Sequence, residues 1–443
     1  MNGDSSKRIT IIGAGFTGLA AAYDLARAGF KVTVLEQDEE IGGLAGGFKV
    51  NNTWLEKFYH HWFTSDEHIT ALIRELGASD NIVPRATRTG MYYHRSLFKL
   101  STPWDLLRFT PLSLVNRLRL GRLVLKARTV KDWHQLEHLT AEEWLVRMGG
   151  REVYKTVWEP LLIGKFGSLA SEISAVWFWN KLKLRGGSRG RDGEEVLNYF
   201  RGGFLTLARM IAQDIRHHGG EIRTSTAVQE ISAESQQVTG VITHTGRIAS
   251  DVVVATFALP IAVDLFAPHV SEDYLTELKR IKYLANICLV LQLDRSLSDI
   301  YWLNVNDPDF PFVGIVEHTN FEPAASYDGH HIVYLSKYLP ETDALFLMDD
   351  AALLRFSIPH IKRMFPAFNE SWISDYHVWR ARYAQPVVER NYSALIPTVD
   401  TPIKGLYLST MAQVYPEDRG TNYAVREGRK VAKIVADSCL SVG

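Results

Sequence analysis

Residues 8–36 read RITIIGAGFTGLAAAYDLARAGFKVTVLE and decide the fold of the chain. A short apolar strand is followed by a glycine turn, a helix rich in Ala and Leu, and a second alternating strand that ends in an acid. These features, in this order, predict a strand–helix–strand unit of a parallel sheet. A lone G-x-G-x-x-G is a weak signal, but here the complete unit surrounds it. The stretch therefore predicts a dinucleotide site at the glycine turn.

Each glycine of the turn has its own expected role. Gly13 permits the tight turn, Gly15 lets the backbone approach a pyrophosphate, and Gly18 lets the helix pack closely on the strand. The N-terminus of the helix presents N–H groups and a positive dipole end to the phosphates. Glu36 ends the second strand, where it is placed to accept hydrogen bonds from the hydroxyls of an adenosine ribose.

A second glycine cluster follows at once in QDEEIGGLAGGF, residues 37–48. Its glycines could let the backbone wrap the far end of an extended cofactor. A flexible surface loop is the other interpretation, and the residues alone leave both open.

The stretch GAGFTGLAAAYDLARAGFKVTVLEQDEEIGGLAGGF, residues 13–48, resembles the start of the flavin-containing amine oxidase superfamily. That superfamily includes protoporphyrinogen oxidases, phytoene desaturases and, more distantly, UDP-galactopyranose mutases. The resemblance implies FAD as the cofactor. Residues 201–231 and 405–438 extend it: the family places the backbone at Val228 near the adenine and the loop 417–422 against the flavin. An ordinary capped helix start is the alternative for that loop.

The resemblance also implies the fold. We expect an α/β protein with a Rossmann-like FAD-binding domain of the GR2 type, the amine oxidase fold, assembled from residues 1–90, 195–265 and 400–443. A mixed α+β substrate domain would take residues 91–194 and 266–399. The expected cofactor-binding residues are Gly13, Gly15, Phe16, Thr17, Gly18, Glu36, Gln37, Gly42, Gly43, Leu44, Ala45, Val228, Asp418, Gly420, Thr421 and Asn422.

Composition excludes several other classes of protein. The 49 basic and 50 acidic residues give a net charge of −1, so no overall field favours nucleic acid. Two cysteines, Cys288 and Cys439, are too few for a disulfide framework and fit a reducing compartment. The N-terminus has no signal-peptide pattern, and no apolar run is long enough to cross a bilayer. We therefore expect a cytoplasmic protein, with peripheral membrane attachment as an option.

Residues 98–130 are the segment for which membrane attachment is an option. They begin the expected helical part of the substrate domain, residues 98–185. They are rich in Leu and Arg and contain no acid after Asp105. Leu114, Leu118 and Leu125 fall on one helical stripe, and Arg119, Arg122 and Lys126 fall on a neighbouring one. The favoured interpretation is a helix whose leucines pack and whose basic side chains reach water. Contact with a membrane surface or with an anionic, greasy substrate is the alternative.

Aromatic residues are concentrated after WEPLLIGKFG, residues 158–167. Trp177, Phe178 and Trp179 are predicted to fill the core, although such a group also lines apolar pockets. Lys165 stands between Gly164 and Gly167 and is a candidate contact to substrate or flavin.

Two adjacent histidines lie in EKFYHHWFTSD, residues 56–66. Neighbouring side chains diverge on a strand or a helix, so one metal ion cannot easily take both His60 and His61. In related flavoenzymes the chain returns to the flavin after the glycine cluster. His60 or His61 would then contact flavin or substrate, or would simply pack.

A second histidine pattern is WHQLEH, residues 133–138. His134, Glu137 and His138 have the H-x-x-E-H spacing of inverted zinc peptidases. The chain offers no clear third ligand, and with 15 histidines a match this short arises readily by chance. We predict no metal.

The substrate half resembles one branch of the superfamily more than others. Amine oxidases carry a lysine that reaches flavin N5 through water, on a strand resembling YLANICLVLQL, residues 283–293. Asn286 falls at that register and Lys282 lies off it, which does not favour amine oxidation. EPLLIGKFG, PFVGIVEHTNF and YPEDRGTNYAV resemble bacterial protoporphyrinogen-oxidase-like proteins. We expect an FAD-dependent oxidoreductase that passes hydride between flavin N5 and a carbon of a bulky, partly apolar substrate, lipid-like or glycosyl.

Two other functions stay open. A redox-neutral flavin-dependent sugar-nucleotide mutase, of the UDP-galactopyranose mutase type, needs paired arginines for a diphosphate. The available arginines are Arg185, Arg189, Arg191, Arg380 and Arg382. The third possibility is a flavin-binding scaffold without chemistry.

Overall fold

The computed structural model describes residues 7–100, 102–188 and 194–440. It confirms the predicted strand–helix–strand unit as β1 (Arg8–Ile12), α1 (Phe16–Arg27) and β2 (Lys31–Leu35). The two strands are parallel and in register from Arg8 beside Lys31 to Ile12 beside Leu35. Residues 9–12 of β1 are all buried because both faces of this parallel sheet are covered.

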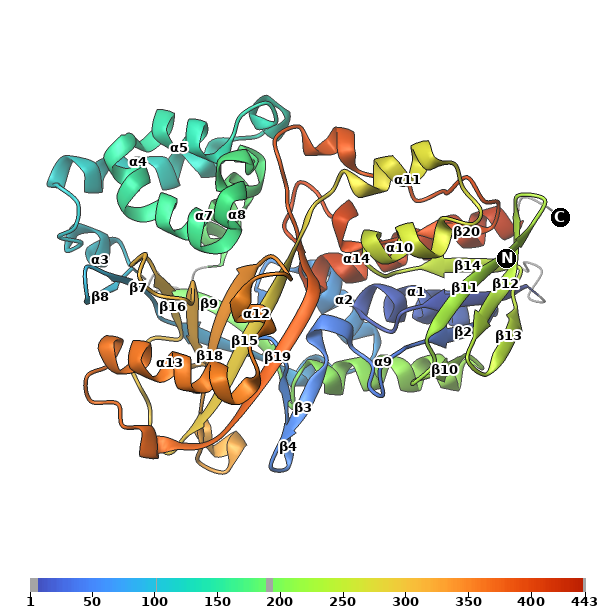
Figure 1. Ribbon diagram of the computed structural model, residues 1–443, viewed down its shortest axis with the longest axis horizontal. Coiled ribbons are helices and arrows are strands. Elements are labelled where there is room, and N and C mark those ends of the chain that lie inside the picture. The colour runs from blue at the N-terminus through green and yellow to red at the C-terminus, as the bar shows by residue number, and fades with distance from the viewer. Residues whose placement is uncertain (1–6, 101, 189–193, 441–443) are drawn as a thin grey trace.

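This sheet takes its strands from three separated parts of the chain. Its five strands, all parallel, run in the order β10 (Glu221–Arg223), β2, β1, β14 (Val252–Ala255) and β20 (Leu406–Leu408). Figure 1 shows the sheet in the right half of the molecule. Residues 201–231, which extend the resemblance, form a helix followed by strands, and residues 405–438 form a strand, a loop and most of the long C-terminal helix.

Alternate residues of each strand face two different cores. Ile9, Ile11 and Val254 pack with α1, α9 (Phe204–His217) and α14 (Thr421–Leu440). Val253 and Ala255 pack on the other side with α10 (Leu259–Phe266) and the antiparallel β11 (Val228–Glu234), β12 (Gln237–Thr243) and β13 (Gly246–Ala249). Helix α11 (Glu272–Lys279) follows α10.

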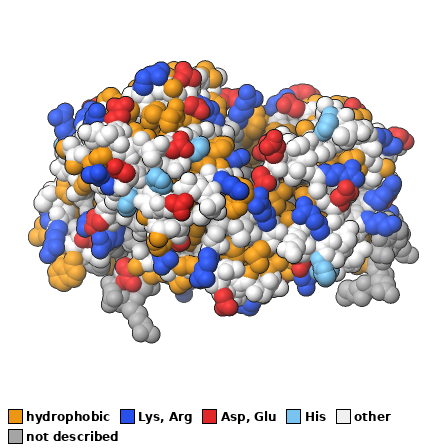
Figure 2. Space-filling view, turned by 90° about the horizontal axis from the view of Figure 1, so that it is seen from below, with side chains coloured by type: hydrophobic (Ala, Val, Ile, Leu, Met, Phe, Trp, Pro, Cys, Tyr) orange, Lys and Arg blue, Asp and Glu red, His pale blue; other side chains and the backbone are white. Residues whose placement is uncertain are grey.

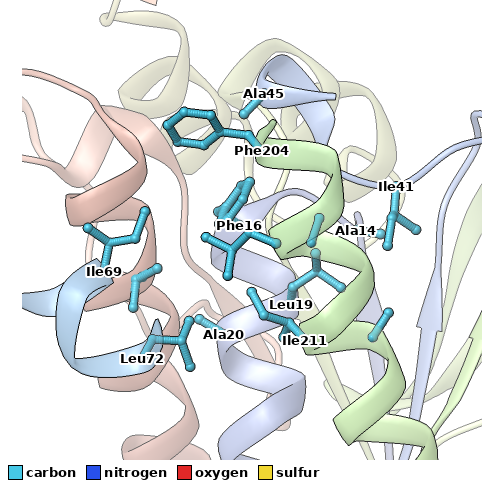
Figure 3. Packing of buried hydrophobic residues seen from close by; sticks show 14 of the residues in the cluster. Ala14, Phe16, Leu19, Ala20, Ile41, Ala45, Ile69, Leu72, Phe204 and Ile211 are labelled. Carbon is cyan, nitrogen blue, oxygen red and sulfur yellow. The ribbon is translucent and has the colours of Figure 1, made fainter. Parts of the chain in front are cut away.

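The first core is centred on α1. Figure 3 shows Phe16 and Leu19 of α1 beside Phe204 and Ile211 of α9, with Ile69 of α2 (Glu67–Glu75) on the far side. Helix α14 crosses α1 closely, because a Cβ at Gly428 would lie 2.3 Å from the Thr17 carbonyl oxygen. The glycine turn therefore rests on a tightly packed helical layer.

A seven-stranded sheet forms the other half of the molecule (Figure 1). Its order is β19 (Ile373–Pro386), β15 (Tyr283–Leu293), β18 (His331–Leu339), β17 (Gly314–Glu317), β16 (Trp302–Val305), β7 (Thr89–Tyr93) and β8 (Ser96–Lys99). All neighbours are antiparallel except β16 and β7. Helices α12 (Ala344–Leu347) and α13 (Asp350–Met364) pack against it.

Two small sheets join the halves, and a helical group lies above the seven-stranded sheet in Figure 1. The sheets are β3 (Gly47–Val50) with β4 (Thr53–Glu56), and β5 (Trp62–Phe63), β9 (Glu195–Phe200) and β6 (Ile82–Thr87). The helices are α3 (Pro103–Leu107), α4 (Leu114–Thr129), α5 (Ala141–Gly149), α6 (Arg151–Val153), α7 (Glu159–Phe166) and α8 (Ala175–Gly187). Trp177, Phe178 and Trp179 of α8 are buried as predicted.

The favoured interpretation of α4 is wrong. Leu114, Leu118 and Leu125 are 61%, 61% and 64% exposed, so this stripe does not pack. The buried face of α4 carries Leu120 and Leu123 instead, and it lies against α5 and α8.

Candidate active site

The glycine turn after β1 meets the second glycine cluster directly. The Gly42 amide donates to the Ala14 carbonyl at 2.8 Å, and Gly15 and Gly42 pair as a parallel bridge. Gly13 has a φ of 106°, and a Cβ there would lie 2.7 Å from Thr256 Oγ1 at the end of β14. The two clusters thus form one backbone surface at the carboxyl ends of adjacent strands, where parallel sheets bind ligands. Residues 42–47 are therefore attached to this turn by backbone hydrogen bonds and do not form a separate surface loop.

Gly15 tests whether this surface suits a pyrophosphate. Its backbone (φ −71°, ψ 175°) is open to any residue, and a Cβ would meet only Gly43 Cα at 3.9 Å. The protein itself therefore does not need glycine there, whereas a ligand lying against the turn would. Helix α1 also begins without a side-chain cap or an acidic residue in its first turn, so its positive end faces the same space. The turn fits a dinucleotide phosphate.

Glu36 closes one end of this surface. Its buried carboxylate accepts the Ala14 amide at 2.8 Å and the Asp38 amide at 3.0 Å. Burial raises its pKa, and the backbone hydrogen bonds oppose that rise. Each oxygen keeps a lone pair for another donor, such as a ribose hydroxyl. The Thr226 amide donates to the Glu36 carbonyl at 2.7 Å, which brings Val228 to this end, while Gln37 is exposed beside it.

His60 lies against the helical layer that carries the glycine turn. Its ring is 5.4 Å from Phe204, and Phe204 is 6.1 Å from Phe16. Figure 3 shows Ala45 of the second glycine cluster next to Phe204; Leu44 precedes it and is half-buried. Burial lowers the pKa of His60 to about 4, so the ring is neutral at pH 7. Because Nδ1 donates to the Phe58 carbonyl, Nε2 is left as an acceptor.

His61 points to the seven-stranded sheet instead. Its Nδ1 is 2.9 Å from the Tyr301 hydroxyl, and its ring packs edge-on against Trp302 and Phe321. Burial, aided by the charge of Arg185, lowers its pKa to about 3. The two histidines diverge as the chain geometry predicts: His60 packs beside Phe204, and His61 faces an aromatic group that the sequence did not reveal.

Metal ligation has no support in the described structure. Within residues 7–100, 102–188 and 194–440, no group of three or more His, Cys, Asp or Glu side chains is arranged to hold a metal ion. His134 pairs with Asp132 at 2.8 Å, and Glu137 accepts the Ser393 amide at 3.0 Å.

Lys165 and Asp418 meet in a buried ion cluster between the two halves. Lys181 Nζ lies 2.5 Å and Lys165 Nζ 3.8 Å from the Asp418 carboxylate, which is 6% exposed. Lys165 Nζ also lies 4.6 Å from the Trp177 ring and 5.1 Å from the Tyr338 ring. Burial lowers the pKa of Lys165 to about 7, although Asp418 opposes it. Burial would raise the pKa of Asp418, but Lys181, Lys165 and Arg419 together hold it far below its usual range.

Arg419 completes the cluster and was overlooked in the sequence, although it stands in the quoted stretch YPEDRGTNYAV. It donates to Gln385 at 3.0 Å and to the Tyr338 hydroxyl at 2.6 Å, and Gln385 donates to Asp418 at 3.2 Å. The charge of Arg419 also reaches His60, whose pKa it lowers further. The cluster therefore lies within electrostatic range of His60.

The start of α14 lies beside this cluster. Thr421 and Asn422 are buried, and Asn422 Oδ1 accepts the Ile69 amide at 3.1 Å. Gly420 is exposed, and Glu417 is engaged by Arg426 at 2.9 Å. On β15, Asn286 is buried against Ser336, whereas Lys282 pairs with Glu172 and Glu389. Neither Asn286 nor Lys282 reaches Asp418; the lysines at the junction, the region around Asp418 between the two halves of the molecule, are Lys165 and Lys181.

Among the described residues, the arginines available for a diphosphate are not assembled into a pair. Arg380 binds Asp350 and two backbone carbonyls, and Arg382 is 3.5 Å from Glu341. Arg185 lies over the Trp302 ring at 5.8 Å. Arg189 and Arg191 lie outside the described residues.

Glu56, the first residue of the quoted histidine segment, is a buried acid whose importance the sequence did not indicate. It is 1% exposed, accepts the Phe204 amide at 2.7 Å at the start of α9, and binds the Tyr199 hydroxyl. Its carbonyl accepts the Tyr334 hydroxyl at 2.7 Å. Glu56 thus ties the His60 segment to α9, β9 and β18.

Glu56→Gln should change the pH dependence of stability. Burial raises the pKa of Glu56 from 4.5 to about 7. A raised carboxyl pKa stabilises the fold below the ordinary value and loses that effect as pH rises toward 7. Between these limits the free energy of unfolding of the wild type should fall relative to that of the variant, by up to about 3 kcal/mol. Urea unfolding across this range measures it.

Glu221→Gln is the matched control, because the exposed Glu221 pairs with Arg223 and its pKa is lowered. It should not reproduce the trend. A constant difference between wild type and Glu56→Gln at all these pH values would show that Glu56 is ionised throughout.

Comparisons with known proteins agree on one family for this chain. The model of the flavin containing amine oxidoreductase family matches residues 16–436. Mitochondrial protoporphyrinogen oxidase of Nicotiana tabacum is 26% identical over 260 residues, covering 52% of this chain and 51% of that enzyme. Zeta-carotene desaturase of Synechocystis sp. is 25% identical over 288 residues, covering 57% and 58%. The chain thus matches little more than half the length of these curated relatives.

A solved structure extends the likeness of fold to almost the whole chain. It comes from Exiguobacterium sp. 255-15, where it is described as a candidate protoporphyrinogen oxidase. It superimposes with a TM-score of 0.78 at 19% identity, covering 98% of this chain and 99% of that one.

Proposed function

Because the chain belongs to the flavin containing amine oxidoreductase family, we propose that it is an FAD-dependent oxidoreductase acting at a carbon centre of a bulky, partly apolar small molecule. FAD is the cofactor of this family, and when bound it supplies hydride transfer at N5. The remaining chemistry, which is binding, orientation and proton handling, falls to the chain's own residues.

The residues divide by position along an extended cofactor. Glu36 and the backbone near Val228 would hold the adenosine end, and the turn at Gly15 would hold the pyrophosphate. The start of α14 at Asn422 and the Asp418 cluster would hold the flavin end. We accordingly propose a GR2-type Rossmann-like domain from residues 1–90, 195–265 and 400–443, with the substrate domain from 91–194 and 266–399.

The observation that supports this proposal best is the set of aromatic and basic side chains at the junction, beside the proposed cofactor surface. Aromatic rings at Trp177, Tyr338 and Trp302 offer apolar contact, while Lys165 and Arg185 offer positive charge among them. Such a set of side chains suits a substrate with a large apolar body and a polar or anionic group. Lys165 Nζ can gain or lose a proton near neutral pH, because its pKa is about 7.

Spectroscopy of the purified protein tests the proposal. The protein should retain FAD, and its spectrum should bleach anaerobically with one of four substrate classes: porphyrinogens, polyprenols, amines or nucleotide sugars. A colourless protein that refuses FAD contradicts the proposal. Turnover of a nucleotide sugar only after flavin reduction, without net electron consumption, supports the mutase instead. A flavin reduced by dithionite but by none of these substrates supports the scaffold.

The pKa of Lys165 is itself measurable. Reductive methylation with ¹³C-formaldehyde labels lysines for NMR titration of the FAD-loaded protein. One signal, absent from Lys165→Arg, should titrate near pH 7, since burial lowers the pKa from its ordinary 10.5. In Asp418→Asn the same signal should titrate at lower pH, because the Asp418 charge raises the pKa of Lys165. A Lys165 signal with the ordinary lysine pKa would remove its proposed role in proton transfer.

A further inference from the structure

The outward face of α4 is apolar, although nothing in the described structure covers it. At about 100° per residue, Leu114, Leu118 and Leu125 lie within about 40° of one another on the helix surface. The opposite face carries the buried Leu120 and Leu123. Trp179 Nε1 of α8 donates to the Ala127 carbonyl at 2.7 Å, which fixes that inner face against the protein. The leucine stripe is therefore held outward by the packing of the other face.

The apolar surface continues onto α3, which packs beside α4. We use the name α3–α4 surface for a group of six exposed side chains: Trp104, Leu107, Leu114, Val115, Leu118 and Leu125. Trp104 is the most exposed of these, at 71%. Among the described residues, six of the eleven exposed large hydrophobic side chains lie in this short stretch. Such a concentration differs from the single apolar side chains that every protein surface carries.

Basic side chains border this stripe on both sides. By the same helical geometry, Arg122 and Lys126 lie on one side of the leucines, and Arg117 and Arg128 lie on the other. Residues 98–131 contain one acid, Asp105, which caps the start of α3. The ion pairs of the described residues do not involve Arg122, Lys126 or Arg128. By contrast, the face in Figure 2 mixes positive and negative side chains over most of its area.

An apolar stripe with a basic border matches the surface of a bilayer that carries anionic headgroups. Apolar side chains enter the boundary between headgroups and acyl chains, Trp favours that boundary, and Lys and Arg meet the phosphates. A second copy of the chain fits less well, since a symmetric contact would bring two basic borders together. Among the residues described, no helix combines the length and apolar character needed to cross a bilayer. Contact would be at the surface only.

We propose that the α3–α4 surface docks the protein on anionic lipid bilayers, with α4 lying in the plane of the interface. Helix α4 packs on α8, and α8 carries Trp177, Lys181 and Arg185 of the junction. Docking therefore places the substrate half of the molecule next to the bilayer. The inference stands on surface chemistry alone and does not depend on the proposed oxidoreductase activity.

Vesicle flotation of the FAD-loaded full chain tests the proposal. The protein should float with vesicles of equal parts phosphatidylcholine and phosphatidylglycerol, stay free with phosphatidylcholine alone, and detach as salt is added. The combined change Leu114→Ser, Leu118→Ser and Leu125→Ser should lower the partition coefficient at least about tenfold. Arg122→Gln with Lys126→Gln should lower it several-fold. Because these side chains are exposed, FAD content and thermal unfolding should stay unchanged.

Leu347→Ser with Phe356→Ser is the matched control, because these exposed apolar residues lie on α12 and α13 and are 70% and 40% exposed. It should float like the wild type. The proposal is overturned if the wild type binds neither vesicle or both equally, or if the leucine variant floats unchanged. It is also overturned if the leucine changes convert a dimer to a monomer in solution, since a second copy would then cover this surface.

Discussion

Replacing Asp418 by asparagine should lower the free energy of unfolding by about 3 kcal/mol at neutral pH. Breaking a buried ion pair costs about 3–5 kcal/mol, because the remaining charge is left without its partner. Here Asp418 is 6% exposed and faces Lys181 and Lys165, with Arg419 nearby. The lower end applies since Lys181, 38% exposed, can turn to water. Urea unfolding of the FAD-free protein measures the change.

The pH dependence gives the prediction a second check. The pKa of Asp418 lies below its ordinary value of 3.8, so its stabilising effect is present above that value and is lost as pH falls further. Wild type and variant should therefore converge in acid. Asp299→Asn is the control: its pairs with Arg88 and Lys99 are half exposed, so it should cost less than about 1 kcal/mol. Equal effects of the two changes would contradict the buried cluster.

Local patterns in the sequence predicted the elements that carry the cofactor surface. The strand–helix–strand unit at 8–36 combines a buried strand, a glycine turn and a helix, each of which is determined by neighbouring residues. The stretch YLANICLVLQL was likewise predicted as a strand and is β15. These signals are strong because the periodicity of the hydrophobic residues and the glycines that end each element indicate the same boundaries within one short stretch.

The direction in which a side chain points could not be predicted in the same way where it depends on residues that are distant in the chain. Chain geometry required His60 and His61 to diverge, but the side to which each turns depends on Phe204 and Tyr301. Those partners lie more than a hundred residues along the chain. The buried state of Glu56 depends on the start of α9 for the same reason. Only the assembled fold brings these residues together.

Helix α4 shows a different limit of sequence reasoning. It has one apolar stripe at Leu120 and Leu123 and another at Leu114, Leu118 and Leu125, nearly opposite each other. Both stripes satisfy helical periodicity, so the pattern does not tell which one packs. The choice is made by α5 and α8, which cover the first stripe. The basic border beside the second stripe was the signal that favoured the exposed alternative.

Both limits of sequence reasoning apply to the ion cluster. Its charged side chains come from three separate segments, with Lys165 on α7, Lys181 on α8 and Asp418 in the loop before α14, and no local pattern links them. Arg419 follows Asp418 directly and still gave no signal, because an arginine in a loop is usually a surface residue. What marks the cluster is burial of several charges at one junction, which only the assembled fold supplies.

Gly15→Ala should leave the fold intact and weaken FAD binding at least about tenfold. The backbone at Gly15 is extended, and an added Cβ meets only Gly43 Cα at 3.9 Å. Alanine should therefore change the stability of the FAD-free protein by less than about 1 kcal/mol, since restriction of the unfolded chain and the loss of a glycine N-cap on α1 oppose each other. The same methyl group would occupy the space that a pyrophosphate needs. Overpacking of that kind costs about 1–3 kcal/mol, and 1.4 kcal/mol is tenfold in affinity. Flavin fluorescence titration and urea unfolding measure the two effects separately.

Two further glycines make the comparison decisive. A Cβ at Gly18 would lie 1.9 Å from the Gly13 carbonyl oxygen, so Gly18→Ala should damage the turn itself and lower stability and FAD affinity together. Gly121, on α4, has room for a Cβ against Leu106, and Gly121→Ala should change neither FAD affinity nor fold. Loss of stability in Gly15→Ala would mean that the protein needs this glycine for its own packing. Unchanged stability with unchanged FAD affinity would mean that the phosphates lie elsewhere. Only lost affinity in a stable protein identifies Gly15 as the point where the cofactor touches the backbone.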